Sequence, residues 1–272
     1  MRYLVTGGAG FIGSNFVRFL LRERPNAEVV NLDALSYAGN RDNIADILDD
    51  PRHVFVHGDI CDPDTVARVI KGIDVVVNLA AETHVDHSIS SDTRFVRTNV
   101  VGVATLLSGA LDSGVQRFIQ VSTDEVYGEL PWLDPENHDS SESPRFTEET
   151  ALSPRSPYSA TKAAADHLTL AYHVTHGLDV IVTRCSNNYG PNQHPEKLIP
   201  LMITRALQDR PLPIYGDGLH VRDWIHVTDH CRGLLAAVEK GTPGKVYNFG
   251  GDTERTNLSV VKEILQIMDR PS

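Results

Sequence analysis

A tyrosine and a lysine that stand four positions apart, Tyr158 and Lys162, could together move a proton. Residues four apart on a helix share a face, so the two side chains would be neighbours. A lysine ammonium beside a phenol lowers its pKa from the usual value of about 10, and the resulting phenolate is a general base. The alternative is an ordinary exposed pair on an amphipathic helix, because this spacing also arises by chance.

Two adjacent carboxyl groups, Asp124 and Glu125, follow the apolar segment 117–121 and the hydroxyls of Ser122 and Thr123. Adjacent carboxylates repel each other unless one of them is protonated. A pair in which one member keeps its proton can supply both an acid and a base to one reaction. The alternative is a turn with two solvated acids at the end of a strand.

Glycines near the N-terminus have the spacing of a phosphate-binding turn. Gly8, Gly10 and Gly13 satisfy G-x-G-x-x-G, and Gly7, Gly10 and Gly13 satisfy G-x-x-G-x-x-G. Such glycines allow a tight turn and a close approach of the backbone to a pyrophosphate at a helix N-terminus. Asp33 follows Gly13 by twenty residues, where an acid binds the ribose hydroxyls of NAD and repels the additional phosphate of NADP. The alternative is a plain turn between a strand and a helix.

The first two-thirds of the chain alternate apolar β-branched segments with helix-like segments, which could position these residues. Strands are expected at 2–6, 28–32, 53–57, 74–79, 117–121 and 178–183, and the main helices at 11–22, 95–113 and 158–176. This alternation predicts an α/β protein with a Rossmann-like doubly wound parallel sheet. Asp59 and Ile60 follow the third strand and are placed to meet an adenine.

The alternation weakens after residue 186, where prolines break the chain into short pieces. We therefore predict a dinucleotide-binding domain at 1–186, which carries the catalytic residues, and a smaller C-terminal lobe at 187–272, which binds mainly substrate. One strand near 246–249 is expected to return to the large sheet. The proline-rich stretch 130–157 is expected to form a surface loop over the site.

Composition argues against several classes of partner. The formal net charge of −11, from 25 basic and 36 acidic residues, does not suit nucleic acid or an anionic membrane. No apolar run approaches the ~18 residues of a membrane span, and the N-terminus leaves no room for a signal peptide. The widely spaced Cys61, Cys185 and Cys231 indicate reduced thiols and a cytoplasmic protein.

Two histidine pairs occur at helical spacing, His226 with His230 and His173 with His176. Neither pair belongs to a metal motif with a third ligand, so we expect helix-surface histidines and no metal. Cys185 has no obvious His–Asp arrangement and is not expected to be a nucleophile.

The glycine turn and the Tyr-x-x-x-Lys spacing together resemble the short-chain dehydrogenase/reductase superfamily, in the extended form that acts on nucleotide sugars. Within it, Thr-Asp-Glu-Val-Tyr-Gly at 123–128 is similar to the nucleotide-sugar 4,6-dehydratases. Epimerases of the superfamily commonly have small residues at positions 124 and 125, and decarboxylating relatives have Glu without the preceding Asp. Further resemblance is found at 81–86, 185–191, 194–200, 212–218, 221–224 and 254–257.

The resemblance implies an enzyme that binds NAD and a nucleotide sugar, with dTDP-glucose as the expected substrate. The implied catalytic residues are Thr123, Asp124, Glu125, Tyr158 and Lys162. The implied cofactor-binding residues are Gly7, Gly10, Phe11, Ile12, Gly13, Asp33, Ala34, Leu35, Ser36, Asp59, Ile60, Leu79, Ala80, Ala81, Thr98, Tyr158, Lys162 and Asn188. The implied substrate-binding residues are Thr83, Thr123, Asn187, Lys197, Leu198, Pro213, Ile214, Tyr215, Arg222 and Asn257. Asn99 matches a structural Asn of the superfamily.

The implied reaction is a dehydration through transient oxidation. Tyr158 would take the O4 proton while NAD takes a hydride from C4, with Thr123 bound to O4 and Lys162 holding the cofactor ribose. The 4-ketone acidifies the C5 proton, which Glu125 would remove while protonated Asp124 donates to the departing C6 hydroxyl. Hydride return to C6 and reprotonation of C5 complete a 4-keto-6-deoxy sugar. Two alternatives stay open: another NAD-dependent nucleotide-sugar enzyme, such as a UDP-sugar dehydratase or a 4-epimerase, or a non-catalytic dinucleotide-binding regulator.

The chain departs from the family pattern in two places. His87 stands where the family usually has Arg, and the chain ends before the family's C-terminal segment, so truncation is expected there.

The helices at 95–113 and 158–176 carry apolar residues on more than one face. Because related dehydrogenases pair these helices with those of a second subunit, we expect a two-fold homodimer with a four-helix interface.

Overall fold

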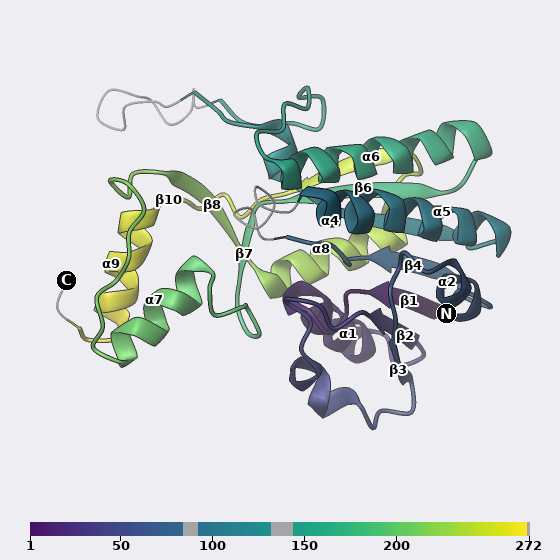
Figure 1. Ribbon diagram of the computed structural model, residues 1–272, viewed down its shortest axis with the longest axis horizontal. Coiled ribbons are helices and arrows are strands. Elements are labelled where there is room, and N and C mark those ends of the chain that lie inside the picture. The colour runs from purple at the N-terminus through teal and green to yellow at the C-terminus, as the bar shows by residue number, and fades with distance from the viewer. Residues whose placement is uncertain (84–91, 132–143, 271–272) are drawn as a thin grey trace.

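The computed structural model describes residues 1–83, 92–131 and 144–270, and within them seven apolar segments form one parallel sheet (Figure 1). The strands are β1 (Arg2–Thr6), β2 (Glu28–Asp33), β3 (His53–His57), β4 (Val75–Asn78), β5 (Arg117–Thr123), β6 (Val180–Cys185) and β9 (Lys245–Phe249). Their inner members are buried on both faces, which is why they read as continuous apolar runs. The sheet confirms the predicted doubly wound α/β fold.

The sheet reverses its direction of growth between β1 and β4. Its order is β3-β2-β1-β4-β5-β6-β9, so the chain adds β2 and β3 on one side of β1 and the remaining strands on the other. In open parallel sheets, ligands bind at the carboxyl edge where the order reverses. This rule places the candidate site beside the end of β1.

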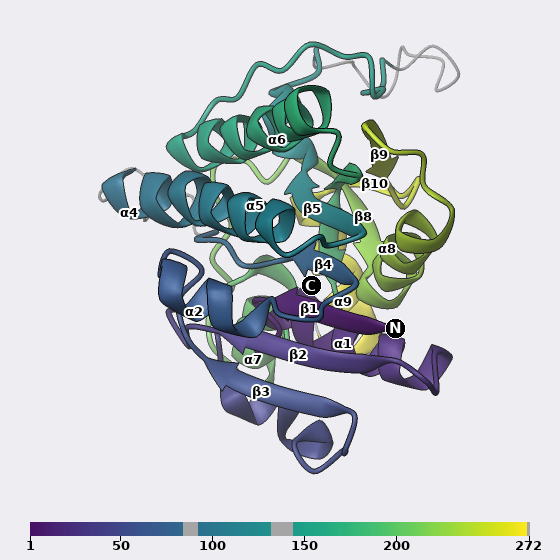
Figure 2. The same ribbon diagram turned by 90° about the vertical axis from the view of Figure 1, so that its right-hand side faces the viewer.

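Two layers of helices cover the sheet, as Figure 2 shows. Their bounds are α1 (Phe11–Glu23), α2 (Pro63–Val69), α5 (Val103–Asp112), α6 (Pro157–His176) and α8 (Val227–Lys240). α1 and α8 pack on one face of the sheet, and α2, α5 and α6 pack on the other. The predicted helices at 11–22 and 158–176 therefore form within one residue of their predicted ends.

The predicted helix at 95–113 consists of three segments with different winding. They are α4 (Asp92–Val96), a π-helical turn η2 (Arg97–Gly102) and α5. The buried Asn99 lies in the π turn, where its side chain accepts a hydrogen bond from Glu82 N at 2.9 Å and donates to Glu82 O at 3.0 Å and Thr161 Oγ1 at 3.0 Å. Asn99 thereby joins the segment after β4 to α6, and wider turns of this kind are frequent near functional sites.

A smaller lobe projects from the carboxyl edge of the large sheet, on the left of Figure 1. It contains β7 (Asn187–Tyr189), α7 (Leu198–Leu207), β8 (Val221–His226), β10 (Glu254–Thr256) and α9 (Asn257–Ile267). Its sheet has the order β10-β8-β7, with β8 antiparallel to β10 and parallel to β7. Besides the expected strand β9, helix α8 also returns from this segment to pack on α1. The division of the chain at residue 186 stays a prediction.

Several predictions fall outside the described residues. His87 lies outside them, and the predicted loop at 130–157 is described only at 130–131 and 144–157, so neither prediction is tested. In the part of the chain that the structure describes, no helix is long and apolar enough to cross a membrane.

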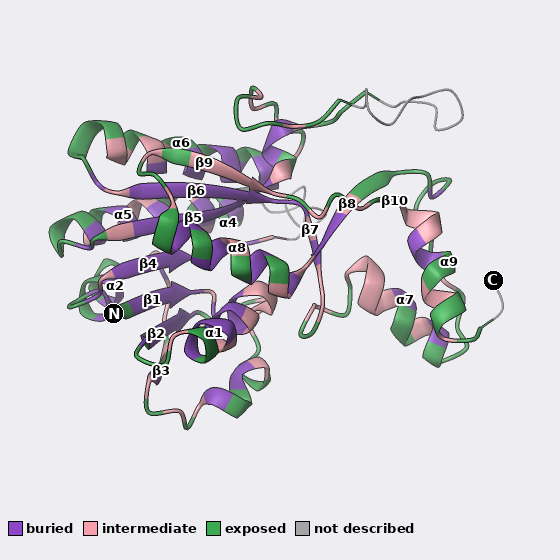
Figure 3. Ribbon diagram, turned by 180° about the vertical axis from the view of Figure 1, so that it is seen from behind, coloured by how far each residue is buried: buried purple, intermediate pink, exposed green. Residues whose placement is uncertain are grey.

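The central strands of the large sheet are buried (Figure 3). Three buried polar side chains lie on neighbouring strands there, Thr6 and Asn78 at the carboxyl ends of β1 and β4 and Gln120 within β5. Thr6 Oγ1 donates to Asn78 Oδ1, and Asn78 Nδ2 donates to Gln120 Oε1 at 2.8 Å. Ala80 N donates to Thr6 Oγ1 at 3.3 Å, so the ladder also fixes the segment that leaves β4. The hydrogen-bonded side chains of Thr6, Asn78 and Gln120 therefore support the strand ends beside the candidate site.

Candidate active site

The glycine turn between β1 and α1 packs against the backbone that leaves β4. Gly7 has a φ of 70°, and a Cβ on it would lie 2.7 Å from Ala80 N, while a Cβ on Gly13 would lie 2.1 Å from Gly7 O. Helix α1 begins after Gly10, and its first turn receives no side-chain cap from the described residues. Its free N–H groups suit an anion, so the turn fits the pyrophosphate of a dinucleotide.

Asp33 at the end of β2 holds the glycine turn. Its Oδ2 accepts from Ala9 N at 2.8 Å, and its Oδ1 accepts from Leu35 N at 2.8 Å. Burial raises the pKa of the carboxyl, and the two backbone hydrogen bonds oppose that shift. Each carboxylate oxygen can accept a further hydrogen bond, so this clamp leaves capacity for the predicted ribose contact.

The other predicted cofactor residues follow the carboxyl ends of neighbouring strands. Ala34, Leu35 and Ser36 follow β2, Asp59 and Ile60 follow β3, Leu79, Ala80 and Ala81 follow β4, Phe11 and Ile12 open α1, and Thr98 lies in η2. Several of them also make contacts within the fold. Asp59 Oδ1 accepts from Cys61 N at 2.9 Å, and Ile60 packs so closely on η2 that a Cβ on Gly102 would lie 2.6 Å from it. Contact of these residues with a cofactor stays a prediction.

Helix α6 presents Tyr158 and Lys162 on the face that covers β5. A capping box between Ser156 and Ser159 starts the helix, with Pro157 in its first position. Tyr158 is 8% exposed and Lys162 is 4% exposed, and Lys162 Nζ donates to Val121 O at 2.7 Å.

The electrostatic environment of Tyr158 differs from the expectation based on spacing alone. Burial raises the pKa of the phenol well above its ordinary value, and the nearby Glu125 and Asp124 raise it further. Desolvation and these carboxylates outweigh the lowering expected from Lys162 in this structure. Formation of a phenolate at Tyr158 therefore depends on the positive charge of nearby groups such as Lys162.

Thr123 ends β5 and fixes the two carboxyl groups that follow it. Its Oγ1 accepts from Glu125 N at 3.2 Å and donates to Asp124 Oδ1 at 3.3 Å, which starts the 3₁₀ turn η3 (Asp124–Tyr127). Burial, followed by the charge of Glu125, raises the pKa of the half-buried Asp124 to about 7. Burial also raises the pKa of Glu125, but the charges of Arg222 and then Lys197 lower it. The environments thus differ: the charge of Glu125 adds to the raised pKa of Asp124, whereas two cations oppose the rise at Glu125.

The raised pKa of Asp124 carries a cost in stability that can be measured. The folded chain binds this proton more tightly than the unfolded chain, so the stability contributed by Asp124 is complete below its unfolded pKa of 3.8 and is lost as pH rises through about 7. An Asn does not titrate, so Asp124→Asn should stabilise the fold increasingly between about pH 4 and about pH 8. We expect a gain on the order of 1–3 kcal/mol at the alkaline end, because one pKa unit corresponds to about 1.4 kcal/mol and solvent reduces the effect.

Thermal unfolding of both proteins across this pH range measures the difference. Asp112→Asn, at an exposed carboxyl, is the control and should show no such trend. A stability difference that stayed constant with pH would refute the raised pKa.

The smaller lobe brings two cations toward these carboxyl groups. Arg222 lies on β8, and Lys197 lies immediately before α7 with Leu198 as the first helical residue. Their charges act on Glu125, so strand β8 and the start of α7 face the end of β5. An Arg and a Lys placed together also suit the diphosphate of a nucleotide sugar.

The remaining predicted substrate-binding residues differ in their position and in their burial. Asn187 Nδ2 donates to Asp223 O at 3.4 Å, and Asn257 N donates to His220 O at 3.0 Å, so both residues also support the backbone. Ile214 and Tyr215 follow Pro213 and are 37% and 78% exposed. Thr83 is the last described residue before the gap at 84–91. Their contact with a substrate stays a prediction.

Asn188 is held on both sides of its amide group. Its Nδ2 donates to Ser186 O at 3.0 Å, and its Oδ1 lies 2.9 Å from Nδ1 of His230, which therefore donates. Burial lowers the pKa of His230 to about 3, so the ring is neutral. The expectation that His230 is a surface histidine is wrong, because α8 turns this side chain into the core, where it is fully buried.

Two sets of supporting hydrogen bonds were not predicted from the sequence. Asp223 on β8 accepts from Gly251 N at 2.7 Å and from Thr253 N at 2.8 Å, which fixes the segment leading to β10 and α9. The adjacent Gly250 and Gly251 could have indicated close backbone packing at this place, because a Cβ on Gly251 would lie 1.9 Å from a backbone oxygen.

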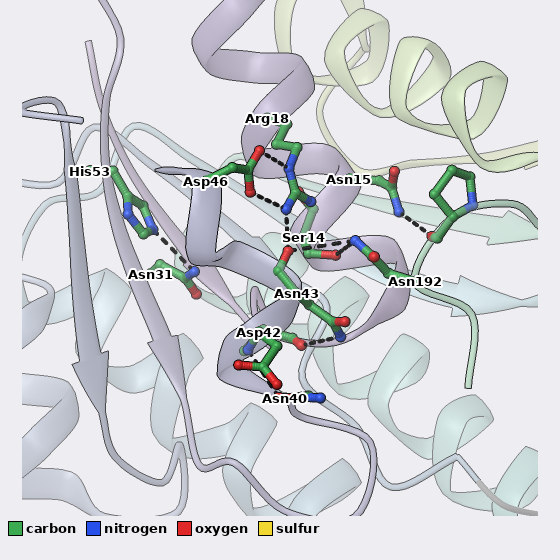
Figure 4. Close-up of polar contacts among 12 residues, drawn as sticks. Ser14, Asn15, Arg18, Asn31, Asn40, Asp42, Asn43, Asp46, His53 and Asn192 are labelled. Atoms are coloured by element: carbon green, nitrogen blue, oxygen red, sulfur yellow. Dashed lines mark hydrogen bonds and ion pairs between the residues drawn. The ribbon is translucent and has the colours of Figure 1, made fainter. Parts of the chain in front are cut away.

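The second set ties the segment after β7 to the cofactor side of the molecule (Figure 4). Asn15 Nδ2 donates to Pro191 O at 2.8 Å, and Asn192 Nδ2 donates to Ser14 Oγ at 3.1 Å. Arg18 Nε donates to Asp46 Oδ2 at 2.7 Å and holds the 3₁₀ helix η1 (Arg41–Ile47) beside α1. No local pattern predicts these contacts, because their partners lie far apart in the sequence.

Comparison with known proteins identifies what this site is similar to. A family model described as the NAD dependent epimerase/dehydratase family matches residues 3–250. The low-salt glycan biosynthesis protein Agl12 of Haloferax volcanii is 53% identical over 98% of this chain and 82% of its own length. The dTDP-glucose 4,6-dehydratase 1 of Escherichia coli is 50% identical over 99% of this chain and 77% of its own length. The crystal structure of a dTDP-glucose 4,6-dehydratase from Streptomyces venezuelae with NAD bound has a TM-score of 0.93 at 50% identity, covering 100% of this chain and 82% of that one.

Epimerases share this fold at lower identity. A UDP-glucose 4-epimerase of Thermotoga maritima has a TM-score of 0.89 at 30% identity and covers 100% of this chain and 84% of that one. The backbone therefore does not distinguish the two reactions, and side chains at the site must do so. The comparisons confirm the resemblance to nucleotide-sugar dehydratases found in the sequence motifs.

Proposed function

This chain belongs to the NAD dependent epimerase/dehydratase family, and from that membership we propose that it dehydrates dTDP-glucose to the 4-keto-6-deoxy sugar. Its closely similar relatives include named dTDP-glucose 4,6-dehydratases at about half identity. It is thus an NAD-dependent lyase of the hydro-lyase class. Epimerisation and a purely regulatory role are not favoured.

The observation that carries this function is the pair Asp124 and Glu125 at the end of β5. A 4-epimerase removes a hydride from C4 and returns it to the opposite face, so it needs no second acid and base for C5 and C6. In this chain, one carboxyl group has a pKa raised to about 7 while its neighbour faces two cations. An elimination of water needs one protonated acid and one ionised base on the same substrate.

The glycine turn and the open start of α1 fit NAD. Gly7, Gly10 and Gly13 leave the space where a Cβ would interfere, and Asp33 favours an unphosphorylated ribose. NAD, when bound, supplies the reversible oxidation at C4 of the sugar, which makes the C5 proton acidic. The remaining steps belong to side chains of this chain.

Each proposed step moves one proton at a stated atom. Tyr158 accepts the proton of the sugar O4, Thr123 hydrogen-bonds the same oxygen, and Lys162 stabilises the phenolate. Glu125 accepts the C5 proton. Asp124 donates its proton to the C6 oxygen, which leaves as water. C6 then receives the hydride that C4 lost, and C5 is reprotonated. The proton left on Tyr158 replaces, through solvent, the one that Asp124 gave up, so protons and leaving group balance.

Substrate and cofactor contacts complete the proposal. Lys197 and Arg222 neutralise the diphosphate, and Asn187 and Asn257 donate hydrogen bonds to the nucleotide side. The other predicted contacts keep their assignments: Phe11, Ile12, Ala34, Leu35, Ser36, Asp59, Ile60, Leu79, Ala80, Ala81, Thr98 and Asn188 for NAD, and Thr83, Leu198, Pro213, Ile214 and Tyr215 for the sugar nucleotide.

Product analysis tests the function directly. The purified protein is incubated separately with dTDP-glucose and UDP-glucose, and each mixture is examined for a 4-keto-6-deoxy product by nuclear magnetic resonance. We expect that product from dTDP-glucose without net reduction of NAD. A galactose epimer in place of the keto sugar supports the 4-epimerase alternative, and a product only from UDP-glucose supports a UDP-sugar dehydratase. Unchanged sugar with tight NAD binding supports the regulator.

We also propose a cytoplasmic location. Cys61, Cys185 and Cys231 are all free thiols. Reduced cysteines are typical of proteins in a reducing compartment such as the cytoplasm.

A second copy of the chain is the proposed macromolecular partner. Phe95, Val103 and Leu106 from the predicted surplus of apolar residues are in fact buried within the subunit. Val96 and Val101 nevertheless remain 46% and 49% exposed on α4 and η2. On the neighbouring α6, Ala160, Ala164 and Ala171 are exposed on one side, with the half-buried Leu168 among them. Together these residues make an apolar face that two-fold pairing of the helical segment 95–113 and α6 would cover.

Placing a charge in this face should separate the copies. We expect the unmodified protein to have the mass of two chains at micromolar concentration, and Ala164→Arg to have the mass of one, because a buried unpaired cation is costly. Light scattering over a dilution series measures both. Gln266→Arg on the exposed side of α9 is the control and should remain dimeric. A single-chain mass for the unmodified protein overturns the proposal.

A further inference from the structure

A buried ion pair lies one helical turn beyond Tyr158 and Lys162. The side chains of Asp166 on α6 and Arg184 on β6 are 0% and 4% exposed, and Arg184 Nε donates to Asp166 Oδ2 at 2.9 Å. Asp166 follows Lys162 by four residues, so the two share a helix face. An apolar pair of similar volume would often stabilise a fold equally well. The stability of the fold therefore does not by itself explain why these two buried residues are charged.

Arg184 is held in place by aromatic and polar groups. Its Nη1 donates to Tyr127 Oη at 2.9 Å, and its guanidinium carbon lies 4.9 Å from the centre of the Tyr127 ring. Tyr127 Oη in turn donates to Asn248 Oδ1 at 2.7 Å. The guanidinium is thus fixed between β6, η3 and β9, and it fixes the carboxylate of Asp166.

Lys162 depends on nearby negative charge because it is buried. Desolvation lowers its pKa, and the groups that raise it are Asp166 on the same helix and then Cys185 on β6. Burial raises the pKa of the Cys185 thiol to about 12, so that group is neutral near pH 7. Burial also raises the pKa of Asp166, but the charge of Arg184 opposes this most strongly. Of the two groups that support Lys162, only Asp166 has an ion-pair partner, Arg184, that favours its charged form.

We propose that Asp166 is a positioning residue which, held by Arg184, keeps Lys162 a cation beside Tyr158. It touches no reacting atom and acts through Lys162. Its catalytic meaning rests on the proposed function, because a phenolate at Tyr158 needs that cation. The arrangement places three titratable side chains in one row along α6, at positions 158, 162 and 166, with the outermost charge anchored to the sheet.

The charge of Lys162 can be titrated without any turnover. The chain has six lysines, so selective ¹³C labelling gives a simple spectrum, and the Lys162 signal is the one lost in Lys162→Met. Asp166→Asn alone leaves Arg184 unpaired in the interior and destabilises the fold. The test variant is therefore the double substitution Asp166→Asn with Arg184→Gln, which removes the ion pair without leaving Arg184 unpaired. We expect the pKa of Lys162 to fall by about one unit or more in this variant, since loss of a nearby opposite charge has an effect of that size.

A kinetic readout accompanies the titration. Oxidation of the bound sugar should lose rate as pH rises through the Lys162 pKa, so this alkaline limit should move to lower pH in the double variant. Asp166→Glu keeps the charge and should retain the wild-type limit. Thr169→Ala, which alters a buried polar side chain of the same helix, is the structural control. An unchanged Lys162 titration in a folded double variant overturns the proposal, and this result does not depend on whether dTDP-glucose is the substrate.

Discussion

Replacing Tyr158 by Phe is expected to slow formation of the keto sugar by about 10²–10⁴-fold, the usual effect of removing a general base. The ring of Tyr158 is buried against Phe95, with ring centres 6.4 Å apart, so Phe retains the packing and removes only the hydroxyl. The block should fall on the first step, because Phe cannot accept the O4 proton. Rapid mixing of the NAD-loaded protein with dTDP-glucose, followed by nicotinamide absorbance, measures that step.

Tyr172→Phe is the matched control for this experiment. It removes the hydroxyl of another tyrosine on α6, which is half-buried and packs beside His176. Its rate should be unchanged. Sugar oxidation at the wild-type rate in Tyr158→Phe would remove Tyr158 from the role of base.

Replacing Glu125 by Gln should instead stop the reaction after oxidation. Gln occupies nearly the same volume but cannot accept the C5 proton, and we expect product formation to fall by about 10²–10⁴-fold. Two signals separate this block from that of Tyr158→Phe. Reduced nicotinamide absorbance should persist after sugar is added, and exchange of the C5 hydrogen with deuterated water should disappear from the sugar spectrum.

Glu129→Gln tests whether loss of charge alone explains the result. It makes the same substitution at an exposed acid four residues away and should leave both signals as in the unmodified protein. Full turnover by Glu125→Gln, or continued C5 exchange, would show that another group is the base.

The Tyr158 and Glu125 variants together test whether α6 and the end of β5 serve different steps of the reaction. If Tyr158 serves oxidation and Glu125 serves elimination, the variants fail at different steps although the charge of Glu125 acts directly on Tyr158. This coupling also predicts that the order of proton transfers matters. A negative Glu125 opposes the phenolate, and the proton that Glu125 later takes from C5 removes that opposition.

Local patterns in the sequence determined most of the scaffold. β-branched runs gave the strands of the large sheet and their alternation with helices, because period and composition are read over a few neighbouring residues. β1 and β3 have the predicted bounds, at Arg2–Thr6 and His53–His57. The glycine turn, the Tyr-x-x-x-Lys spacing and the adjacent carboxyl groups were equally visible, since each depends on residues within a single turn or helix.

What only the tertiary structure decided depends on partners that are distant in the chain. The direction of the Tyr158 pKa shift, the burial of His230 and the pairing of Asp166 with Arg184 all follow from which side chains pack together. The same holds for Asn99, whose π turn reaches the segment after β4. Desolvation and charge interactions vary steeply with burial and distance, and a one-dimensional pattern contains neither quantity. The sequence therefore determined which groups could do chemistry, whereas the fold decided the electrostatic setting in which they would do it.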